Sequence, residues 1–411
     1  MKKVFTKILI MLAFGFIGLS THAAIWTQKA NYGGTGRKHG PACFTIGTSA
    51  YVGLGNDGSS TDNYPTDFWK WDQTTNAWTQ IAAFPGVGRE GCIGFSLGTT
   101  GYVGMGYNSV NTHYYGDIWA YNSSNNTWAA KNNFTGGMRE FATCLVINNI
   151  AYIGCGFYQS GFQSYDLNDF YAYNSTNDSW APQTYFPGSQ RCGAFGFVLN
   201  NIAYIGTGDS SYYPFMGNSK GFYAYDPASN TWAQKANFPG SGRMGCCAFA
   251  LNNIGYAGLG LDNNASANND FYKYDPSTDT WTQVANCGIS DFPADGFNIG
   301  IKGYFVGGGS STPTKAFWEY AGGAAGIEEI SNDMNISIYP VPASTLLNIH
   351  QSTPSPNQQL IIIDIMGNEV YKKNLTGIDN SISIANYSNG IYFYEVRGTE
   401  GSARGKFVVQ K

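Results

Sequence analysis

The sequence contains little charge and few histidines. Asp, Glu, Lys and Arg make up 12% of its 411 residues, about half the share that is usual in proteins, and the formal net charge is −4. Such a chain has no basic surface, so we expect no nucleic acid partner. Among the histidines, only His39 and His113 lie outside the two terminal segments, and no CxxC or His/Cys cluster occurs. We therefore expect no metal and no other cofactor.

The chain has one long apolar run, and it lies near the N-terminus. Ile8 to Leu19 are almost wholly apolar, three lysines precede them, and Ala23 and Ala24 offer a cleavage site. This pattern is typical of a secretory signal peptide, which we predict over residues 1–23. The alternative, a transmembrane anchor, would need a longer apolar run. No later segment is apolar enough to span a bilayer, so we expect an exported mature chain without a transmembrane segment.

The middle of the sequence repeats itself about every 50 residues. In each repeat a Gly-rich loop ends in arginine, as in "NFPGSGR" (237–243). A short apolar stretch, a strand such as "YIGTG" (204–208), a variable loop and an aromatic strand such as "DFYAYN" (169–174) follow in that order. A polar turn and a tryptophan end the unit. The tryptophans, spaced by 49 to 52 residues, are Trp26, Trp78, Trp128, Trp180, Trp232 and Trp281.

Short β-rich runs separated by Gly, Asn and Ser turns predict antiparallel strands. Four short strands in each unit are typical of a propeller blade. The ordered set of Arg, Tyr-x-Gly-x-Gly, aromatic-x-Tyr-Asp/Asn and Trp resembles the kelch repeat, and the resemblance covers residues 24–320. It implies an all-β, six-bladed kelch-type propeller. Because the first tryptophan precedes the first complete unit, we expect the strand around Trp26 to complete the blade of residues 292–320 and to close the ring.

The C-terminal part of the chain has a different pattern. Residues 321–332 are predicted to be a flexible linker, and strand signals recur about every ten residues over 333–411. They predict a small immunoglobulin-like β-sandwich. "YPVPA" (339–343), "DIMGNEV" (364–370), "NGIY" (389–392) and the basic last strand resemble the type A C-terminal sorting domain of the type IX secretion system of Bacteroidota.

The resemblance to this sorting domain implies a route and a destination. The protein would be exported to the periplasm and would meet the type IX secretion machinery through residues 333–411. The product would be secreted or attached to the outer-membrane surface. The alternative is an ordinary appended β-sandwich that binds a ligand.

Eight cysteines would allow disulfides in an exported protein. Six of them follow the repeated arginines, where inner strands are predicted and a small buried residue fits. We expect mostly free, packed thiols, with disulfides between neighbouring blades as the alternative. The six are Cys43, Cys92, Cys144, Cys192, Cys246 and Cys247.

The repeated arginines are candidate ligand residues. In an antiparallel four-stranded blade, the loop that enters the first strand and the loop between the second and third strands leave from one face. We therefore expect the arginines near the mouth of the central channel, on the face with the long loops. They are either scaffold residues that bind neighbouring carbonyl groups or a ring that binds an anionic ligand. The arginines are Arg37, Arg89, Arg139, Arg191 and Arg243, and the sixth blade has Asp291 or Phe292 instead.

Aromatic residues are frequent in the long loops of the second to fourth repeats. Tyr107, Tyr115, Tyr158 and Tyr213 are candidates to contact a ligand. Exposed rings beside polar side chains suit sugars or protein side chains. The alternative is that these rings pack on one another and order the loops.

These observations favour a secreted or surface-displayed binding propeller without catalytic activity. Its ligand would be a glycan or a protein on the loop-rich face. Two alternatives stay open. Kelch-type sialic acid epimerases also have six blades and need no metal, and Glu90 and Glu140 would supply acid–base groups here. A passive structural component of a surface layer or matrix is the other alternative.

Overall fold

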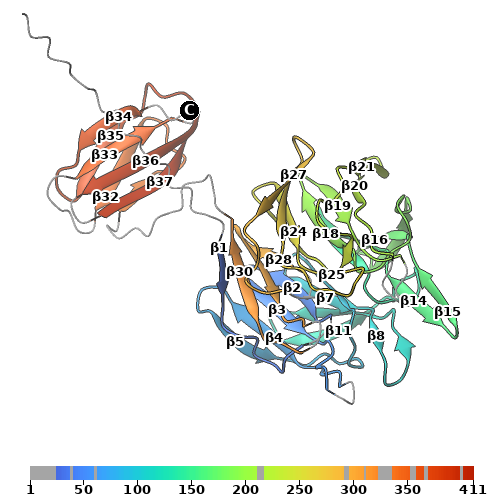
Figure 1. Cartoon of the computed structure of the whole chain (residues 1–411). Coiled ribbons are helices and arrows are strands. Elements are labelled where there is room, and N and C mark those ends of the chain that lie inside the picture. Colours follow the sequence, from blue (N-terminus) through green and yellow to red (C-terminus); the bar gives the residue numbers. More distant parts are fainter. Residues whose placement is uncertain are drawn as a thin grey trace, which may run out of the picture. The chain divides into compact units, whose positions relative to one another are not determined.

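The computed structural model describes residues 25–37, 40–59, 63–210, 217–290, 296–309, 312–322, 336–351, 358–364, 369–398 and 401–411. Contacts divide the chain into two compact units, Ala23–Gly323 and Ala324–Lys411, which are described separately below (Figure 1). The regular elements of the described residues are all strands. Among the same residues, no helix is long and apolar enough to cross a membrane. The predicted signal peptide lies outside these ranges.

The first unit is a ring of six four-stranded antiparallel sheets, which confirms the predicted six-bladed propeller (Figure 1). The first strands of neighbouring blades contact one another around a central channel. From the channel outwards, the strands of blades 1 to 3 are β2 (Ala42–Ile46), β3 (Ser49–Gly53), β4 (Phe68–Asp72) and β5 (Ala77–Ile81); β6 (Ile93–Leu97), β7 (Thr100–Gly104), β10 (Ile118–Asn122) and β11 (Thr127–Lys131); and β12 (Thr143–Ile147), β13 (Ile150–Gly154), β16 (Phe170–Asn174) and β17 (Ser179–Gln183). Those of blades 4 to 6 are β18 (Phe195–Leu199), β19 (Ile202–Gly206), β20 (Phe222–Asp226) and β21 (Thr231–Lys235); β23 (Cys247–Leu251), β24 (Ile254–Gly258), β26 (Phe271–Asp275) and β27 (Thr280–Val284); and β28 (Phe297–Ile299), β29 (Lys302–Val306), β30 (Phe317–Ala321) and β1 (Ile25–Gln28).

Three pairs of short strands extend the loops between the second and third strands of a blade. Blades 2 and 3 carry hairpins in these loops, and the loop of blade 5 pairs with the residues that enter its first strand. The pairs are β8 (Tyr107–Asn108) with β9 (His113–Tyr114), β14 (Phe157–Ser160) with β15 (Gln163–Asp166), and β22 (Arg243–Met244) with β25 (Leu261–Asp262).

The repeated tryptophans join each outer strand to the preceding blade. Every one of the six indole Nε1 groups donates a hydrogen bond to a backbone carbonyl of the adjoining blade, at 2.9–3.2 Å. In blade 1, Trp78 donates to the Ala30 carbonyl, and the Ala30 N–H donates to the side chain of Asn76. Asn76 has a φ of 50°, a left-handed conformation that asparagine tolerates in turns. The polar turn before the tryptophan therefore also binds the neighbouring blade.

The chain's first strand closes the ring. β1 pairs with β30, so that Trp26 lies opposite Tyr320. Beside this pair, the buried carboxylate of Glu319 accepts hydrogen bonds from Lys302 Nζ at 2.9 Å and the Tyr304 hydroxyl at 2.8 Å. Burial raises the pKa of Glu319, but these two partners outweigh it and hold the pKa below its usual value. Lys29, which follows β1, lies 3.4 Å from the same carboxylate and ties the strand to blade 6.

The Gly-x-Gly sequence at the end of each second strand links blades at the loop-rich face. Its middle residue takes a left-handed conformation, as at Met105 with a φ of 59°. The glycine that follows, Gly106, has a φ of 103° and donates its N–H to the carbonyl of Arg139 in the next blade, at 2.7 Å. Gly55, Gly156 and Gly208 make the equivalent bonds at 2.8 Å. The motif is thus an inter-blade connection, and the arginine backbone is its acceptor.

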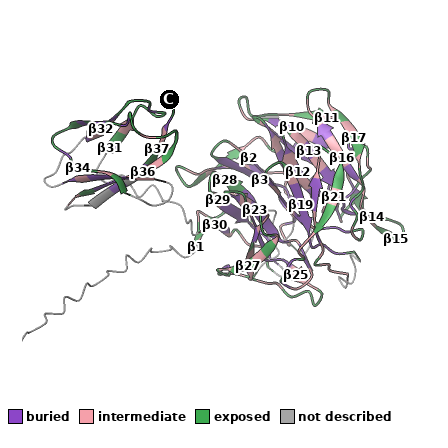
Figure 2. Cartoon of the chain, turned by 90° about the horizontal axis from the view of Figure 1, so that it is seen from above, coloured by how far each residue is buried: buried purple, intermediate pink, exposed green. Residues whose placement is uncertain are grey.

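The core lies between the blades. Six clusters of buried side chains alternate with the six sheets, and each cluster combines residues of two adjacent blades. The outer strands of blades 1 to 5 share one pattern, in which exposed residues dominate, as β17 and β21 show in Figure 2. Area buried between blades is the main stabilising term of the ring.

The second unit is a sandwich of two antiparallel sheets around one buried cluster. The immunoglobulin-like assignment of this sandwich stays a prediction. One strand, β34, is charged and mostly exposed, and its sequence "EVYKKN" shows no clear hydrophobic alternation. The sheets are β31 (Ile336–Tyr339), β32 (Leu346–Gln351) and β35 (Asp379–Ser383), and β34 (Glu369–Asn374), β33 (Gln359–Ile363), β36 (Gly390–Gly398) and β37 (Gly401–Val409).

Candidate functional site

The five repeated arginines turn into their own blades. Each side chain is at most 1% exposed. Each guanidinium donates a hydrogen bond to the carbonyl of the middle residue of the Gly-x-Gly sequence, from 2.5 Å at Arg37 to 3.4 Å at Arg89. An aromatic ring of the entering loop lies 4.5–5.3 Å from each guanidinium carbon. This burial does not agree with the hypothesis of an arginine ring that meets a ligand at the channel mouth. The contacts are those of the scaffold alternative.

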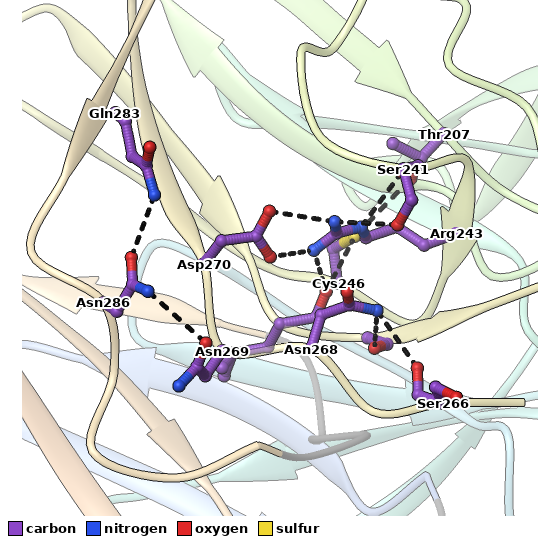
Figure 3. Close-up of polar contacts among 12 residues, drawn as sticks. Thr207, Ser241, Arg243, Cys246, Ser266, Asn268, Asn269, Asp270, Gln283 and Asn286 are labelled. Carbon is purple, nitrogen blue, oxygen red and sulfur yellow. Dashed lines mark hydrogen bonds and ion pairs between the residues drawn. The ribbon is translucent and has the colours of Figure 1, made fainter.

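Four of the arginines have a carboxylate partner in the same blade. It is the aspartate that opens the third strand, and the pairs are Arg37–Asp67, Arg89–Asp117, Arg139–Asp169 and Arg243–Asp270. In blade 5, Asp270 accepts two hydrogen bonds from Arg243, at 2.5 and 3.0 Å, and Ser241 accepts two more (Figure 3). Burial lowers the pKa of Arg243, but Asp270 outweighs it and raises the pKa above the usual value. The guanidinium is therefore fixed and neutralised.

In blades 2 to 5, the residue after the arginine lies against the long loop of its blade. Glu90 pairs with Tyr107 and Glu140 with Phe157 through two backbone hydrogen bonds of 2.9 Å in each pair. Glu140 is 1% exposed, and the Tyr64 hydroxyl lies 3.1 Å from Glu90 Oε1. Sequence reasoning did not foresee that the acidic residues take these positions while the arginines turn away. The alternation of side chains along an extended segment was the available signal.

Aromatic residues of the long loops pack on one another over blades 2 and 3. Tyr114 is buried and lies 4.5 Å from Tyr107 and 5.3 Å from Tyr158, measured between ring centroids. Burial raises the pKa of Tyr114, and the charge of Glu140 adds to the rise. Tyr107 and Tyr158 thus contribute to loop order, which was the alternative interpretation. Tyr213, like Asp291 and Phe292, lies outside the described residues.

Tyr115 occupies a different place, in a pocket between blades 2 and 3. The pocket has a volume of about 340 Å³ and is lined by Tyr115, His113, Asp117 and Asn133 together with Phe134 and Met138. One face of the Tyr115 ring lies 3.6 Å from the guanidinium carbon of Arg89, and its hydroxyl accepts a hydrogen bond from Asn111.

The pocket also presents polar groups at fixed positions. The Asp117 side chain is 30% exposed although it binds Arg89 and the Trp119 indole. Burial raises the pKa of Asp117, but the hydrogen bonds from Arg89 outweigh it, so the pKa stays below the usual value. His113 and Asn133 are exposed at the rim. The pocket is thus bordered by the Tyr115 ring, the fixed Asp117 carboxylate and the polar side chains of His113 and Asn133.

The central channel is lined mainly by residues of the first strands. A cavity of about 330 Å³ lies there, bordered by small residues, including Cys43, Cys144 and Cys246, and by larger ones, including Phe44, Phe95, Phe195 and Phe297. None of the eight cysteines forms a disulfide, and only Cys144 is more than slightly exposed. Burial raises the pKa of Cys246 to about 11, so this thiol stays protonated. Among the described residues, no group of three His, Cys, Asp or Glu side chains could hold a metal ion.

Comparison with known proteins finds a matching family model in each of the two parts of the chain. Residues 337–410 match the family model of the secretion system C-terminal sorting domain, and residues 260–288 match that of the kelch motif. The solved structure titled "Structure of YjhT" is similar with a TM-score of 0.58 and 15% identity, over 71% of this chain and 96% of that chain. No curated protein sequence matches.

At this identity the structural likeness concerns the fold alone. The sorting domain indicates a secreted or surface-attached protein and implies contact with the secretion machinery. The six sheets, the repeated motif and the two matched family models all indicate the same two-domain architecture. The chain is a kelch-repeat six-bladed β-propeller that carries a C-terminal type IX secretion sorting domain.

Proposed function

We propose that the protein is a secreted binding propeller and that the pocket between blades 2 and 3 takes a glycan. The observation that carries the proposal is the arrangement around Tyr115. One face of its ring is held against Arg89, while His113, Asn133 and Asp117 offer hydrogen-bonding groups around the same hollow. Sugars are bound by an aromatic surface that packs against C–H groups and by fixed polar groups that bind hydroxyls.

The charge of the site favours a glycan without acidic groups. The arginines nearest to the pocket, Arg89 and Arg139, are buried and paired with aspartates. Asp117 remains partly exposed in the pocket and carries a negative charge at neutral pH because its pKa is low. The Arg89–Asp117 pair has no net charge and offers an acidic sugar no counter-charge, whereas a neutral or amino sugar would accept or donate hydrogen bonds.

The test is glycan-array screening of the full secreted chain, followed by calorimetric titration of the bound glycan. We expect the double variant His113→Ala/Asn133→Ala to bind at least about tenfold more weakly, since two rim contacts of about 1 kcal/mol are lost. Tyr185→Ala is the matched control, because Tyr185 is 57% exposed in a connection between blades 3 and 4. A pocket variant that binds like the wild type, or an array without any bound glycan, would contradict the proposal.

The sialic acid epimerase alternative rests on a different part of the face. The buried Glu140 and the Tyr64–Glu90 contact would provide acid–base groups. The arginines that would hold the sugar carboxylate are, however, buried in the blades. Turnover of free sialic acid in an NMR assay, abolished by Glu140→Gln, would favour this function. A passive surface component would show neither binding nor turnover.

We also propose the type IX route for export. The sorting domain at residues 337–410 supports passage through the periplasm and delivery to the outer-membrane surface. The signal peptide predicted over residues 1–23 would start this route.

A further inference from the structure

Blade 4 departs from the pairing of arginine with aspartate. Gly221 opens its third strand, where blades 1, 2, 3 and 5 have aspartate, but Arg191 is retained. In blade 6 both partners are missing, because Ala316 opens the third strand and residues 288–296 contain no arginine. Only blade 4 keeps the cation without the carboxylate.

Arg191 and Arg243 share most of their other partners, and Arg191 Nη1 also makes a long contact of 3.4 Å with the neutral carbonyl oxygen of Gly221. Each donates to the backbone carbonyl and to the hydroxyl of the serine two residues earlier, Ser189 or Ser241. Each also donates to the carbonyl of the middle Gly-x-Gly residue, at 2.6 Å for Arg191 and 3.1 Å for Arg243. These neutral partners occur in both blades, so they do not replace the carboxylate. Figure 3 shows the complete set in blade 5, including the aspartate.

No anion balances the charge of Arg191 among its described partners. The side chain is 1% exposed, and burial holds its pKa below the usual value, whereas the pKa of Arg243 is raised by Asp270. The part of the blade 4 loop outside the described residues, 211–216, has the sequence "SYYPFM" and contains no acidic residue. Burial of a guanidinium without a counter-charge is unfavourable. A carboxylate that binds from outside the chain would therefore stabilise the folded protein.

The place of the missing carboxylate adjoins the surface. Asp270 is 21% exposed and Asp117, at the same position in blade 2, lines the pocket described above. A Cβ atom on Gly221 would lie 3.1 Å from Tyr223 Cε2, 3.3 Å from Ser219 Oγ and 3.6 Å from Arg191 Nη2. This side of the glycine therefore faces the guanidinium, and the Tyr223 ring and the Ser219 hydroxyl must shift slightly to admit a carboxylate. Tyr223 follows at the position of Trp69 and Trp119, whose indoles donate to the aspartates of their blades.

We propose that blade 4 binds the carboxylate group of a small molecule at Gly221, where it takes the place of the missing aspartate on Arg191. The planar guanidinium offers the two parallel N–H groups that Asp270 uses in blade 5. The carboxylate belongs to a free organic acid or to a sugar acid. The site is separate from the pocket between blades 2 and 3, so each proposal can fail without the other.

The test compares thermal unfolding of the full chain in increasing acetate, glucuronate, glucose or chloride at constant pH and ionic strength. We expect the two carboxylates, but not glucose or chloride, to raise the midpoint of the wild type. The rise saturates and is on the order of 2–4 °C when the carboxylate exceeds its Kd tenfold. Saturation at lower glucuronate than acetate identifies a sugar acid, and equal concentrations identify a free acid.

Two reciprocal variants make the test specific. Gly221→Asp supplies the carboxylate within the chain, so its midpoint should rise without additive and no longer respond to acetate. Asp270→Gly should melt lower and gain a second acetate response, since it copies blade 4 in blade 5. Arg191→Met, which removes the cation, should also lose the response if Gly221→Asp does not fold. A wild type that does not respond, or a response that persists in Gly221→Asp or Arg191→Met, would overturn the proposal.

Discussion

Replacement of Trp26 by alanine tests how the ring is closed. This tryptophan lies on β1, which reaches blade 6 from the opposite end of the propeller sequence. Its ring lies 4.9 Å from Phe271, 5.6 Å from Phe305 and 4.9 Å from Tyr320, between centroids. Its Nε1 group donates to the carbonyl of Ala285 at 3.1 Å. One side chain thus joins β1 to blades 5 and 6.

These contacts determine how much Trp26→Ala should lower the free energy of unfolding. Truncation of a buried tryptophan to alanine costs about 3–5 kcal/mol, and Trp26 is only partly buried, so we expect about 2–3 kcal/mol. For a domain of this size that lowers the unfolding midpoint by roughly 5 °C. Because β1 is only four residues long and is not linked to β30 by a turn, loss of Trp26 should also free the strand and expose the edge of β30.

The assay is thermal unfolding of the full chain together with limited proteolysis. Trp128→Ala is the matched control, since Trp128 makes the same kind of contacts and donates to Ala82, but its strand is linked to β10 by a tight turn. Both variants should melt lower, whereas only Trp26→Ala should be cleaved rapidly near its N-terminus and aggregate at concentrations where the control stays soluble. Equal resistance of the two variants to protease, or an unchanged midpoint for Trp26→Ala, would refute the reasoning.

Two further predictions concern the ion pairs and the sorting domain. Asp117→Asn should destabilise the chain by about 2 kcal/mol at pH 7, because Arg89 loses its counter-charge. The wild-type pKa of Asp117 is lowered in the folded state, so its contribution is complete above about pH 4 and is lost as the pH falls through the folded pKa. Urea unfolding of both chains should therefore give a difference that shrinks in acid, and a constant difference would contradict it. A chain that ends at residue 335 should stay in the periplasm, which cell fractionation would show, and normal surface delivery would speak against the sorting function.

The architecture could be predicted from the sequence because the same ordered set of strand and turn motifs recurs in successive units of about 50 residues. Strand order, blade number and the loop-rich face follow from the spacing of the tryptophans and the Gly-x-Gly sequences. Two details needed coordinates. The hydrogen bond from Gly106 to the Arg139 carbonyl depends on a φ of 103°, which sequence does not reveal. The strand β34 presents mostly exposed residues, so hydrophobic alternation did not mark it.

The candidate site was harder to predict because it depends on where side chains point. The repeated arginines precede the first strands of their blades, as their place in the repeat indicates, and their side chains enter the blades. The spacing contained a signal, since an aspartate opens the third strand 27 to 30 residues after each of four arginines. Tyr107 and Tyr115 are eight residues apart in one loop, but one packs against Tyr114 and the other faces a pocket. The register of the hairpin decides which tyrosine packs in the loop and which faces the pocket, and no local sequence pattern specifies that register here.

A repeat protein provides its own reference for judging exceptions. A blade that loses both arginine and aspartate, as the sequence of blade 6 does, loses two charges that balance each other, and such replacements are often close to neutral. A blade that loses only the aspartate keeps a buried cation, and removal of one partner from a buried pair costs about 3–5 kcal/mol. Blade 4 is of this second kind, because it keeps Arg191 without an aspartate. A single substitution, Gly221→Asp, would restore the pair that the other blades have. The fold does not require this loss of stability, since four other blades keep a complete pair at the same kind of loop. The difference between Arg191 and Arg243 is therefore best explained by a carboxylate that comes from outside the chain.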